Sequence, residues 1–360
     1  MIDDVEKAEK PNVIEEKDDA SETPAPISLD CGDNKPDIEI GGWSQLGYHN
    51  RSTGMFNNHP DQLQLHQTWL YAEKIADGSQ GLGFGFRIDY VYGTDGPDTQ
   101  AFGNPPGSWD IDWDNGGFYG SALPQLYGEV AMGDLSFKVG HFFTTVGYEV
   151  VPANGNFFYS HAYTMYNSEP FTHTGVLGSL DMGDVNGYFG WTAGWDTGFD
   201  QFGGSNFLGG FSVDLSDTEA LTYMATVGKI GNGTDQQGYS HSLVYDVAVT
   251  DRLDYVIQSD LVDFNSTGAG DKRSIGLNQY LLYDLNDKWR AGTRFEWWRT
   301  EVSPGDNADL LAWTVGLNYQ RSSHLVFRPE LRWNRDNQGV LIPAGDNQKI
   351  GFGCDMIYTY

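Results

Sequence analysis

Long apolar runs are absent from this 360-residue sequence, and basic residues are scarce. No window approaches the ~18 consecutive apolar residues of a membrane-crossing helix, so the sequence predicts no such helix. Lysine and arginine number 21 against 50 aspartates and glutamates, which gives a formal net charge of -29. That charge repels phosphate backbones, so nucleic acid is not an expected partner.

Cysteine is nearly absent as well. Cys31 and Cys354 stand near opposite ends of the chain, so a disulfide framework is excluded by number. Cys354 shares the parity of Phe352, Met356 and Tyr358 in the last segment and is expected to face the same side as they do. Two free thiols are therefore expected rather than one bridge.

Aromatic residues and glycine, by contrast, are abundant: 11 Trp, 20 Tyr, 20 Phe and 46 Gly. Apolar residues alternate with polar ones over nearly the whole length, as in the stretch from 171 to 200. There Val185, Phe189, Trp191 and Trp195 share one parity, and Asp196 has the other. A period of two indicates strands, because successive side chains leave a pleated backbone on opposite sides.

The alternation predicts sixteen strands connected in sequence order. Their expected ranges are 38–50, 62–76, 81–93, 120–132, 134–142, 172–182, 185–198, 205–215, 219–230, 238–249, 253–264, 273–285, 288–302, 308–321, 323–336 and 347–358.

The connections between these strands alternate between short and long. Short ones, such as Gly133, Gly183-Asp184 and Asn286-Asp287, contain residues that tolerate tight hairpin turns. Long ones include 51–61, 94–119 and 143–171. Outer-membrane barrels have this pattern, with short periplasmic turns and long extracellular loops. A soluble sandwich would not explain it, nor strands of ten to fourteen residues, since soluble strands average ~5–6.

The sequence therefore predicts an all-β fold, a transmembrane antiparallel up-and-down barrel of about 16 strands over residues 38–360. The apolar and aromatic parity is expected to face lipid, and the acidic and glycine-rich parity to face water inside. Residues 1–37, with 12 acids and 4 lysines, are expected to form a disordered segment.

The N-terminal MIDDVEKAEK lacks the basic head and apolar stretch of a secretion signal. Either a signal has been removed or the protein is not exported, and the barrel architecture favours removal.

Four pieces of residues 137–178 resemble the putative β-barrel porin-2 (OmpL-like) family: VGHF, VGYEV, NFFYSHAYT and PFTHTG. The resemblance implies an outer-membrane channel in a Gram-negative bacterium. The terminal Tyr358-Thr359-Tyr360 also resembles the aromatic signal that such barrels offer to the barrel-assembly machinery. Outer-membrane lipid and that machinery are thus expected partners, and a homotrimer is suggested by analogy with other sixteen-stranded porins.

A sixteen-stranded barrel encloses an aqueous lumen, so the sequence must also supply what narrows it. The best candidate is the loop 143–171, because loops of that length are usually functional. Its aromatic and charged residues suit an inward fold against the wall better than solvent; packing over the barrel mouth or against another subunit is the alternative. The predicted constriction residues are Tyr148, Glu149, Phe158, Tyr159, His161, Tyr163 and Glu169.

Wall charges are expected to divide by position, giving a transverse field across the lumen and a weak cation preference. Glu296 and Glu330 could also simply pair with neighbouring arginines. The predicted basic lining is Arg87, Lys138, Arg290, Arg294, Arg328 and Arg332, and the acidic lining is Asp181, Asp196, Asp214, Asp246, Asp254, Asp260 and Asp284.

No catalytic or metal-binding spacing is present, so neither an enzyme nor a cofactor is expected. The leading interpretation is a passive porin for small hydrophilic solutes and ions. The alternatives are a substrate-specific channel, for instance for sugars on Tyr148, Phe158 and Tyr159, and a structural or adhesive barrel without an open pore.

Overall fold

The computed structural model describes residues 38–54, 56–101, 109–110, 118–200, 203–231, 233–268, 270–303, 307–342 and 347–360. The expected acidic segment 1–37, with Cys31, lies outside these residues. Sixteen strands make up the sheet: β1 Glu39–His49, β2 Gln62–Lys74, β3 Leu82–Gly93, β4 Gly120–Met132, β5 Leu135–Phe143, β6 Thr172–Asp181, β7 Val185–Thr192, β8 Ser205–Ser216, β9 Glu219–Lys229, β10 Gln237–Thr250, β11 Leu253–Asn265, β12 Asp271–Asn286, β13 Trp289–Ser303, β14 Ala308–Ser322, β15 Leu325–Asp336 and β16 Ile350–Thr359.

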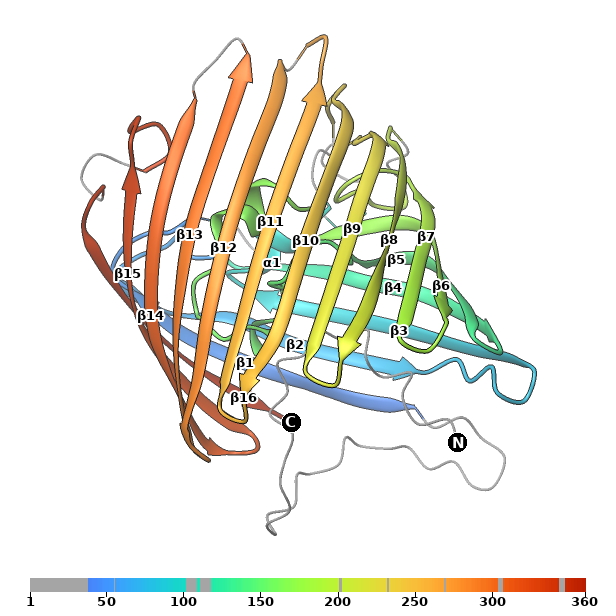
Figure 1. The fold of residues 1–360 in the computed structure, drawn as a ribbon, viewed down its shortest axis with the longest axis horizontal. Helices are drawn as coiled ribbons and strands as arrows, with labels where there is room; N and C mark the ends of the chain where they lie inside the picture. Colours follow the sequence, from blue (N-terminus) through green and yellow to red (C-terminus); the bar gives the residue numbers. More distant parts are fainter. Residues whose placement is uncertain are drawn as a thin grey trace.

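Each strand pairs antiparallel with its neighbours in sequence, and β1 pairs with β16, so the sheet is a closed barrel (Figure 1). The closing register runs from Trp43 opposite Thr359 to His49 opposite Gly353. Tyr360 and Gly42 then exchange backbone hydrogen bonds of 2.9 and 3.0 Å. The predicted up-and-down barrel is confirmed.

Short helices lie in the described parts of the long loops, among them α1 Gly96–Thr99, η3 Ala153–Gly155 and α2 Tyr163–Asn167. Among the described residues, none of the helices has both the length and the apolar character needed to cross a membrane. The tight turns use the conformation that their glycines allow, since Gly133 and Gly183 have φ of +58° and +84°.

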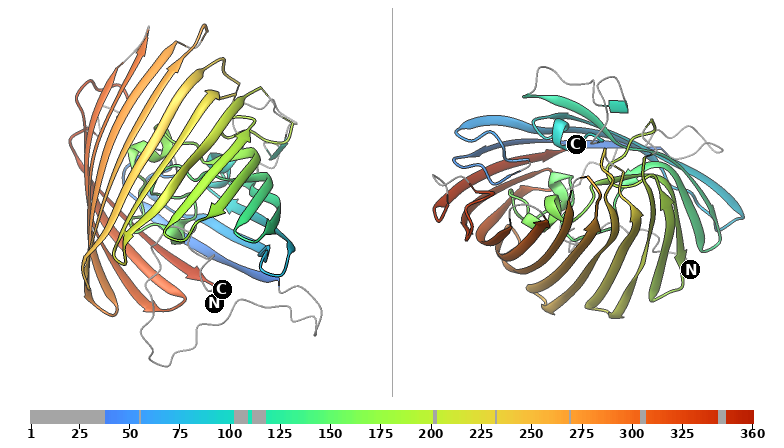
Figure 2. Two further views of the ribbon diagram at one scale, coloured as in Figure 1. Left: turned by 45° about the vertical axis from the view of Figure 1, so that its right-hand side comes forward. Right: turned by 90° about the horizontal axis from the view of Figure 1, so that it is seen from above.

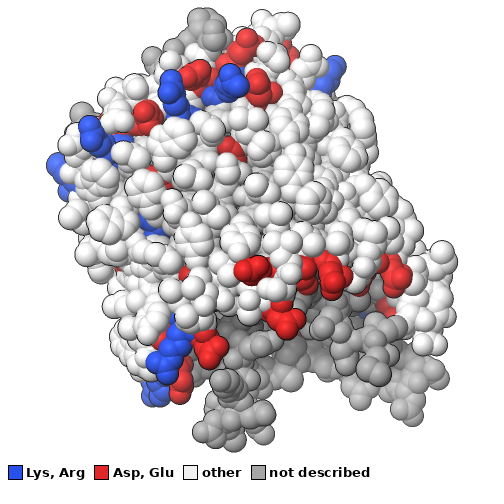
Figure 3. Space-filling view, viewed as in Figure 1, with Lys and Arg blue, Asp and Glu red and all other residues white. Residues whose placement is uncertain are grey.

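Strand β12 illustrates how the sequence pattern becomes two faces. Leu281 and Tyr283 are 44% and 43% exposed, whereas Tyr280 and Leu282 are each 1% exposed. The exposed parity carries the apolar side chains on the outer surface, where they form a broad uncharged band between two charged rims (Figure 3). Such a band is what lipid acyl chains require of a barrel.

The inward parity is less polar than the sequence suggested. Trp43 and Trp69 stack with ring centroids 4.8 Å apart, and both are almost completely buried. Trp298 is also buried, although its neighbour Trp297 has the outward parity. Aromatic side chains therefore also fill the barrel interior, and not all of them face lipid.

Strand β7 ends at Thr192, six residues before its predicted end. The chain turns away because Gly194 and Asp196 have φ of +119° and +49°. Trp195 consequently lies 7% exposed against Phe264, with Nε1 donating to Thr226, and does not face lipid as expected. The alternating pattern continued through this segment and gave no sign of the turn.

Candidate functional site: the segment across the lumen

The segment 143–171 connects β5 to β6 and includes η3 and α2. Seen from above, its green ribbon lies within the ring of strands (Figure 2). Asn156 stabilises its first bend, because its side chain accepts from Val150 N at 2.9 Å and donates to Val150 O at 2.6 Å. Gly147 has φ of +90°, and a Cβ there would meet the Glu169 carboxylate at 1.6 Å, so only glycine fits.

Two buried arginines of the wall hold the centre of this segment. Arg294 of β13 contacts Glu149 at 2.5 Å and Glu296 at 2.8 Å, and it donates to Ser160 O at 2.6 Å. Arg332 of β15 contacts Glu296 at 2.8 Å and donates to His161 O at 3.1 Å. Each guanidinium therefore joins a carboxylate of the wall to the backbone of the segment. A buried charge needs such partners, because it has lost its contact with water.

Strand β15 supplies two further anchors. Glu330 accepts from Tyr159 N at 3.0 Å and from Ser160 N at 3.2 Å. Arg328 pairs with Asp355 at 2.5 Å and donates to Ala153 O at 2.8 Å. These contacts satisfy the backbone of the segment where it runs beside β15.

Side chains of β11, β12 and β13 hold the rest of the segment. Five side chains of these strands donate a hydrogen bond to the segment: Gln258 to Glu169 at 2.5 Å, Asn278 to Thr164 at 2.5 Å, Tyr280 to Glu149 at 3.1 Å, Lys272 to Asn167 O at 2.6 Å and Trp298 to Ser168 at 2.9 Å.

The aromatic residues of the segment are buried against the wall. Tyr148, Phe157 and Phe158 pack on Val244, Val256, Tyr280 and Leu282. Arg294 lies 5.0 Å from the centre of the Phe158 ring, and Arg332 lies 4.9 Å from that of Tyr163. Every predicted constriction residue is buried, with exposures from 3% to 7%: Tyr148, Glu149, Phe158, Tyr159, His161, Tyr163 and Glu169.

The charge of Glu149 is maintained at this buried position. Burial by itself raises the pKa of its carboxyl, but the Arg294 guanidinium, followed by His161 and the Ala162 amide, lowers it to about 2. The segment is therefore held by an ionised carboxylate at neutral pH.

The basic side chains predicted to line the lumen each contact a carboxylate or an aromatic ring. Arg87 lies between Glu73 at 2.9 Å and Asp89 at 2.8 Å. Arg290 contacts Asp254 and lies 3.2 Å from Asp284. The nitrogen of Lys138 lies 4.9 Å from the centre of the Tyr127 ring.

The predicted acidic residues occupy two different environments. Asp260 is 1% exposed and accepts from Gln258 at 2.9 Å. Asp196 is not on a strand, because β7 ends before it; it accepts from Phe171 N and Thr172 N at 2.7 and 2.9 Å. The others lie toward the short-turn ends of their strands and are half-buried or exposed: Asp181, Asp214, Asp246, Asp254 and Asp284.

The interior therefore differs between its two ends. Toward the long loops, inward side chains from many strands are less than 9% exposed, among them His66, Thr226, Gln258 and Asn278. Toward the short turns, the lining of half-buried acids is open to solvent.

Sequence reasoning missed a second polar cluster beside the segment, formed by His49, His66 and Asp95. Tyr159 OH lies 2.6 Å from His66 Nε2 and 3.0 Å from His49 Nδ1, and His66 Nδ1 lies 2.9 Å from Asp95 Oδ1. The inward parity of the two histidines was the available signal. No group of three or more His, Cys, Asp or Glu side chains in the described part of the chain could hold a metal ion.

Solved structures with a similar fold include an outer-membrane protein and porins. OmpT of Vibrio cholerae has a TM-score of 0.60 at 10% identity, with 91% of this chain and 99% of that chain covered. An anion-selective porin from Comamonas acidovorans has a TM-score of 0.60 at 9% identity, with 91% of this chain and 100% of that chain covered. A mutant of the Rh. blastica porin has a TM-score of 0.54 at 12% identity, with 90% of this chain and 100% of that chain covered. At these identities the likeness establishes the fold alone.

No curated protein sequence matches the chain. The model of one family, described as putative beta-barrel porin-2, OmpL-like, matches residues 37–360, nearly the whole sequence. That family resides in the bacterial outer membrane, and the barrel with its uncharged outer band agrees with this location. The chain belongs to the OmpL-like beta-barrel porin-2 family.

Proposed function

We propose that this protein is an outer-membrane porin through which small hydrophilic solutes and ions diffuse passively, along a water-filled lumen narrowed by residues 143–171. The observation that supports the narrowing is the set of contacts from Arg294, Glu296 and Glu330 to the segment. Their side chains have the parity opposite to that of the outer apolar band, which supports an inward position of the segment.

Family membership and the porin titles among the structural neighbours point to a channel rather than an enzyme. We further propose outer-membrane lipid and the assembly machinery as partners. A homotrimer is proposed because one solved form of Vibrio cholerae OmpT is a trimer.

Single-channel recording of the refolded chain in a planar bilayer tests the proposal. The chain should conduct, and a variant in which residues 149–166 are replaced by a short Gly-Ser linker should conduct several-fold more, because the lining freed by the deletion becomes accessible. An equal conductance in both proteins would refute the narrowing, although not the channel.

A barrel without an open pore is the second candidate. It is favoured by the burial of inward side chains toward the long loops, where Thr226, Gln258 and Arg294 are all nearly inaccessible. A wild-type chain that is silent in the bilayer, together with a conducting deletion variant, would identify 143–171 as a plug.

A substrate-specific channel is the remaining candidate. Tyr148, Phe158 and Tyr159 are 6%, 3% and 4% exposed, so in this conformation they offer no aromatic surface to a passing sugar. Saturable block of the conductance by one solute would favour this candidate nevertheless.

A further inference from the structure

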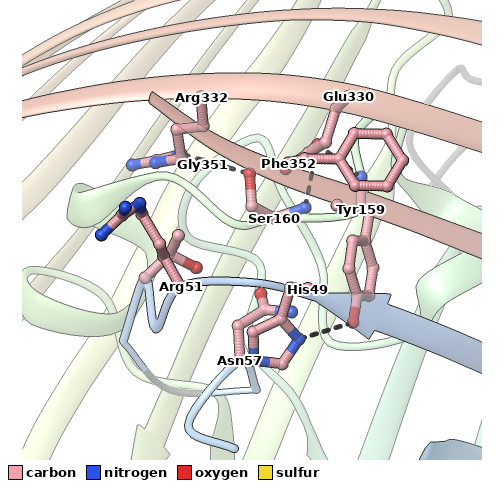
Figure 4. Close-up of a pocket in the computed structure, with 11 residues that line it drawn as sticks. His49, Arg51, Asn57, Tyr159, Ser160, Glu330, Arg332, Gly351 and Phe352 are labelled. Carbon is pink, nitrogen blue, oxygen red and sulfur yellow. Dashed lines mark hydrogen bonds between the residues drawn. The ribbon is translucent and has the colours of Figure 1, made fainter. Parts of the chain in front are cut away.

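A small polar pocket opens where the first long loop meets the segment 143–171. Its cavity of about 10 Å³ has room for about one water molecule. Residues from four parts of the chain line it, and the half-buried Arg51 and Thr53 connect it to solvent. In Figure 4, His49 and Asn57 lie together below Arg51, with Ser160 and Arg332 on the other side.

A continuous chain of hydrogen-bonding groups leads from a buried carboxylate to this pocket. Asp95 accepts from Gln67 Nε2 at 2.9 Å, and its other oxygen lies 2.9 Å from His66 Nδ1. His66 Nε2 lies 2.6 Å from Tyr159 OH, and that hydroxyl lies 3.0 Å from His49 Nδ1. The four titratable residues in this series of hydrogen bonds are at most 4% exposed.

With Asp95 ionised, Tyr159 protonated and His49 neutral, two proton arrangements give each contact one donor. With His66 neutral, His66 Nδ1–H donates to Asp95, Tyr159 O–H donates to His66, and His49 Nδ1–H donates to Tyr159. His49 Nε2 is then an acceptor. With one more proton, His66 is a cation that donates at both nitrogens, and Tyr159 donates to His49 Nδ1. In that arrangement His49 Nε2 carries hydrogen and is a donor.

Two buried atoms of the pocket, His49 Nε2 and Asn57 Oδ1, make no close hydrogen bond with the described residues. The His49 ring also interacts with the Asn57 backbone, and the Asn57 side chain interacts with Tyr159. His49 and Asn57 are 3% and 2% exposed. A buried polar atom left unpaired costs free energy, so an occupant that satisfies both is favoured.

We propose that this pocket is a binding subsite for a hydroxyl group of an uncharged polyhydroxylated solute, a sugar or polyol. A hydroxyl donates and accepts, so it satisfies His49 Nε2 in either proton arrangement and can donate to Asn57 Oδ1. Arg51 disfavours a cation there, and an anion without a proton offers no donor to Asn57. The cavity admits one hydroxyl group, while the rest of the solute stays toward Arg51 and the mouth.

The inference deepens the proposed porin function, since it names the class of solute, but binding can be measured without conductance. Saturation-transfer NMR on the refolded full chain, in a detergent that contains no sugar, uses glucose and acetate as separate probes. Wild type should give a glucose signal and none for acetate. His49→Phe should weaken glucose binding about three- to tenfold, the value of one hydrogen bond.

His324→Phe is the matched control, because His324 lies at the short-turn rim and should leave binding unchanged. Asn57→Ala is a second variant in case His49→Phe does not fold, and heat-dependent gel migration checks folding in each. Equal glucose binding in wild type and both pocket variants would overturn the proposal. So would a signal from acetate alone, or no signal from either probe, which would leave the pocket as a site for water only. A protein that binds glucose but does not conduct would refute the porin and keep the subsite.

Discussion

Arg294 carries its charge at 0% exposure between the carboxylates of Glu149 and Glu296. Because the pKa of Glu149 is lowered from 4.5 to about 2 in the folded protein, its ionised form contributes stability above the unfolded pKa. That contribution is lost as the pH falls through about 2. Titration of Glu149 therefore cannot release the segment between pH 5 and 8.

Glu149→Gln should lower the free energy of unfolding by about 3 kcal/mol, since removing one partner leaves a buried guanidinium with less compensation. Guanidinium unfolding of the chain in vesicles measures this. Glu301→Gln is the control, because Glu301 and its partner Arg299 are 49% and 51% exposed. Its effect should stay below about 1 kcal/mol. Equal losses in both variants would contradict the role given to Glu149.

Asp196 has the opposite shift, since burial raises its pKa from 3.8 to about 7 even though the Phe171 and Thr172 amides oppose this. The unfolded chain then releases this proton at lower pH than the folded one, so stability should fall from about pH 4 to about pH 7. Asp196→Asn should flatten that part of the profile of thermal midpoint against pH, whereas Asp184→Asn, at an exposed turn, should not. An unchanged slope in Asp196→Asn would refute the assignment.

At the scale of the strand, the outward parity should tolerate charge only near its ends. Phe295 is 42% exposed in the middle of β13, and Leu285 is 47% exposed at the turn end of β12. Phe295→Arg should cost about 2–4 kcal/mol and Leu285→Arg about 0–1 kcal/mol. Unfolding in phospholipid vesicles distinguishes them, and a similar cost for both would argue against the lipid-facing assignment.

Strands could be predicted from the sequence because alternation is a local property, whereas the loop contacts are not local. Glu149 and Arg294 are 145 positions apart in the sequence, and Tyr159 and His66 are 93 positions apart. Such pairs depend on the path of the segment 143–171, which no periodicity encodes. The end of β7 was missed for the same reason, since Gly194 and Asp196 turn the backbone while the pattern continues.

At the scale of the whole molecule, the excess of acidic over basic side chains in the lumen should govern which ions the channel prefers. Arg87, Arg294 and Arg328 are each neutralised by carboxylates, so the basic wall expected from the sequence does not act as free charge. The open short-turn half of the lumen instead has five of the predicted acids, and three of them, Asp246, Asp254 and Asp284, lie around Arg290.

Reversal potentials under a salt gradient should therefore indicate a weak cation preference, and the triple change of Asp246, Asp254 and Asp284 to Asn should reduce it. Asp251→Asn with Asp287→Asn, at exposed turns, is the control pair and should change it little. Anion preference in the unaltered chain would refute the prediction.

Closure of the barrel depends on the pairing of β1 with β16. The strand that seals the seam ends at Thr359, and Tyr360 completes it with two backbone bonds to Gly42 and a side-chain bond to Trp69 O. The two edges of the sheet stay unpaired until β16 meets β1, so both strands must be present before the barrel can close. A sheet without β16 would keep two open edges, and each of them could pair with strands of other chains.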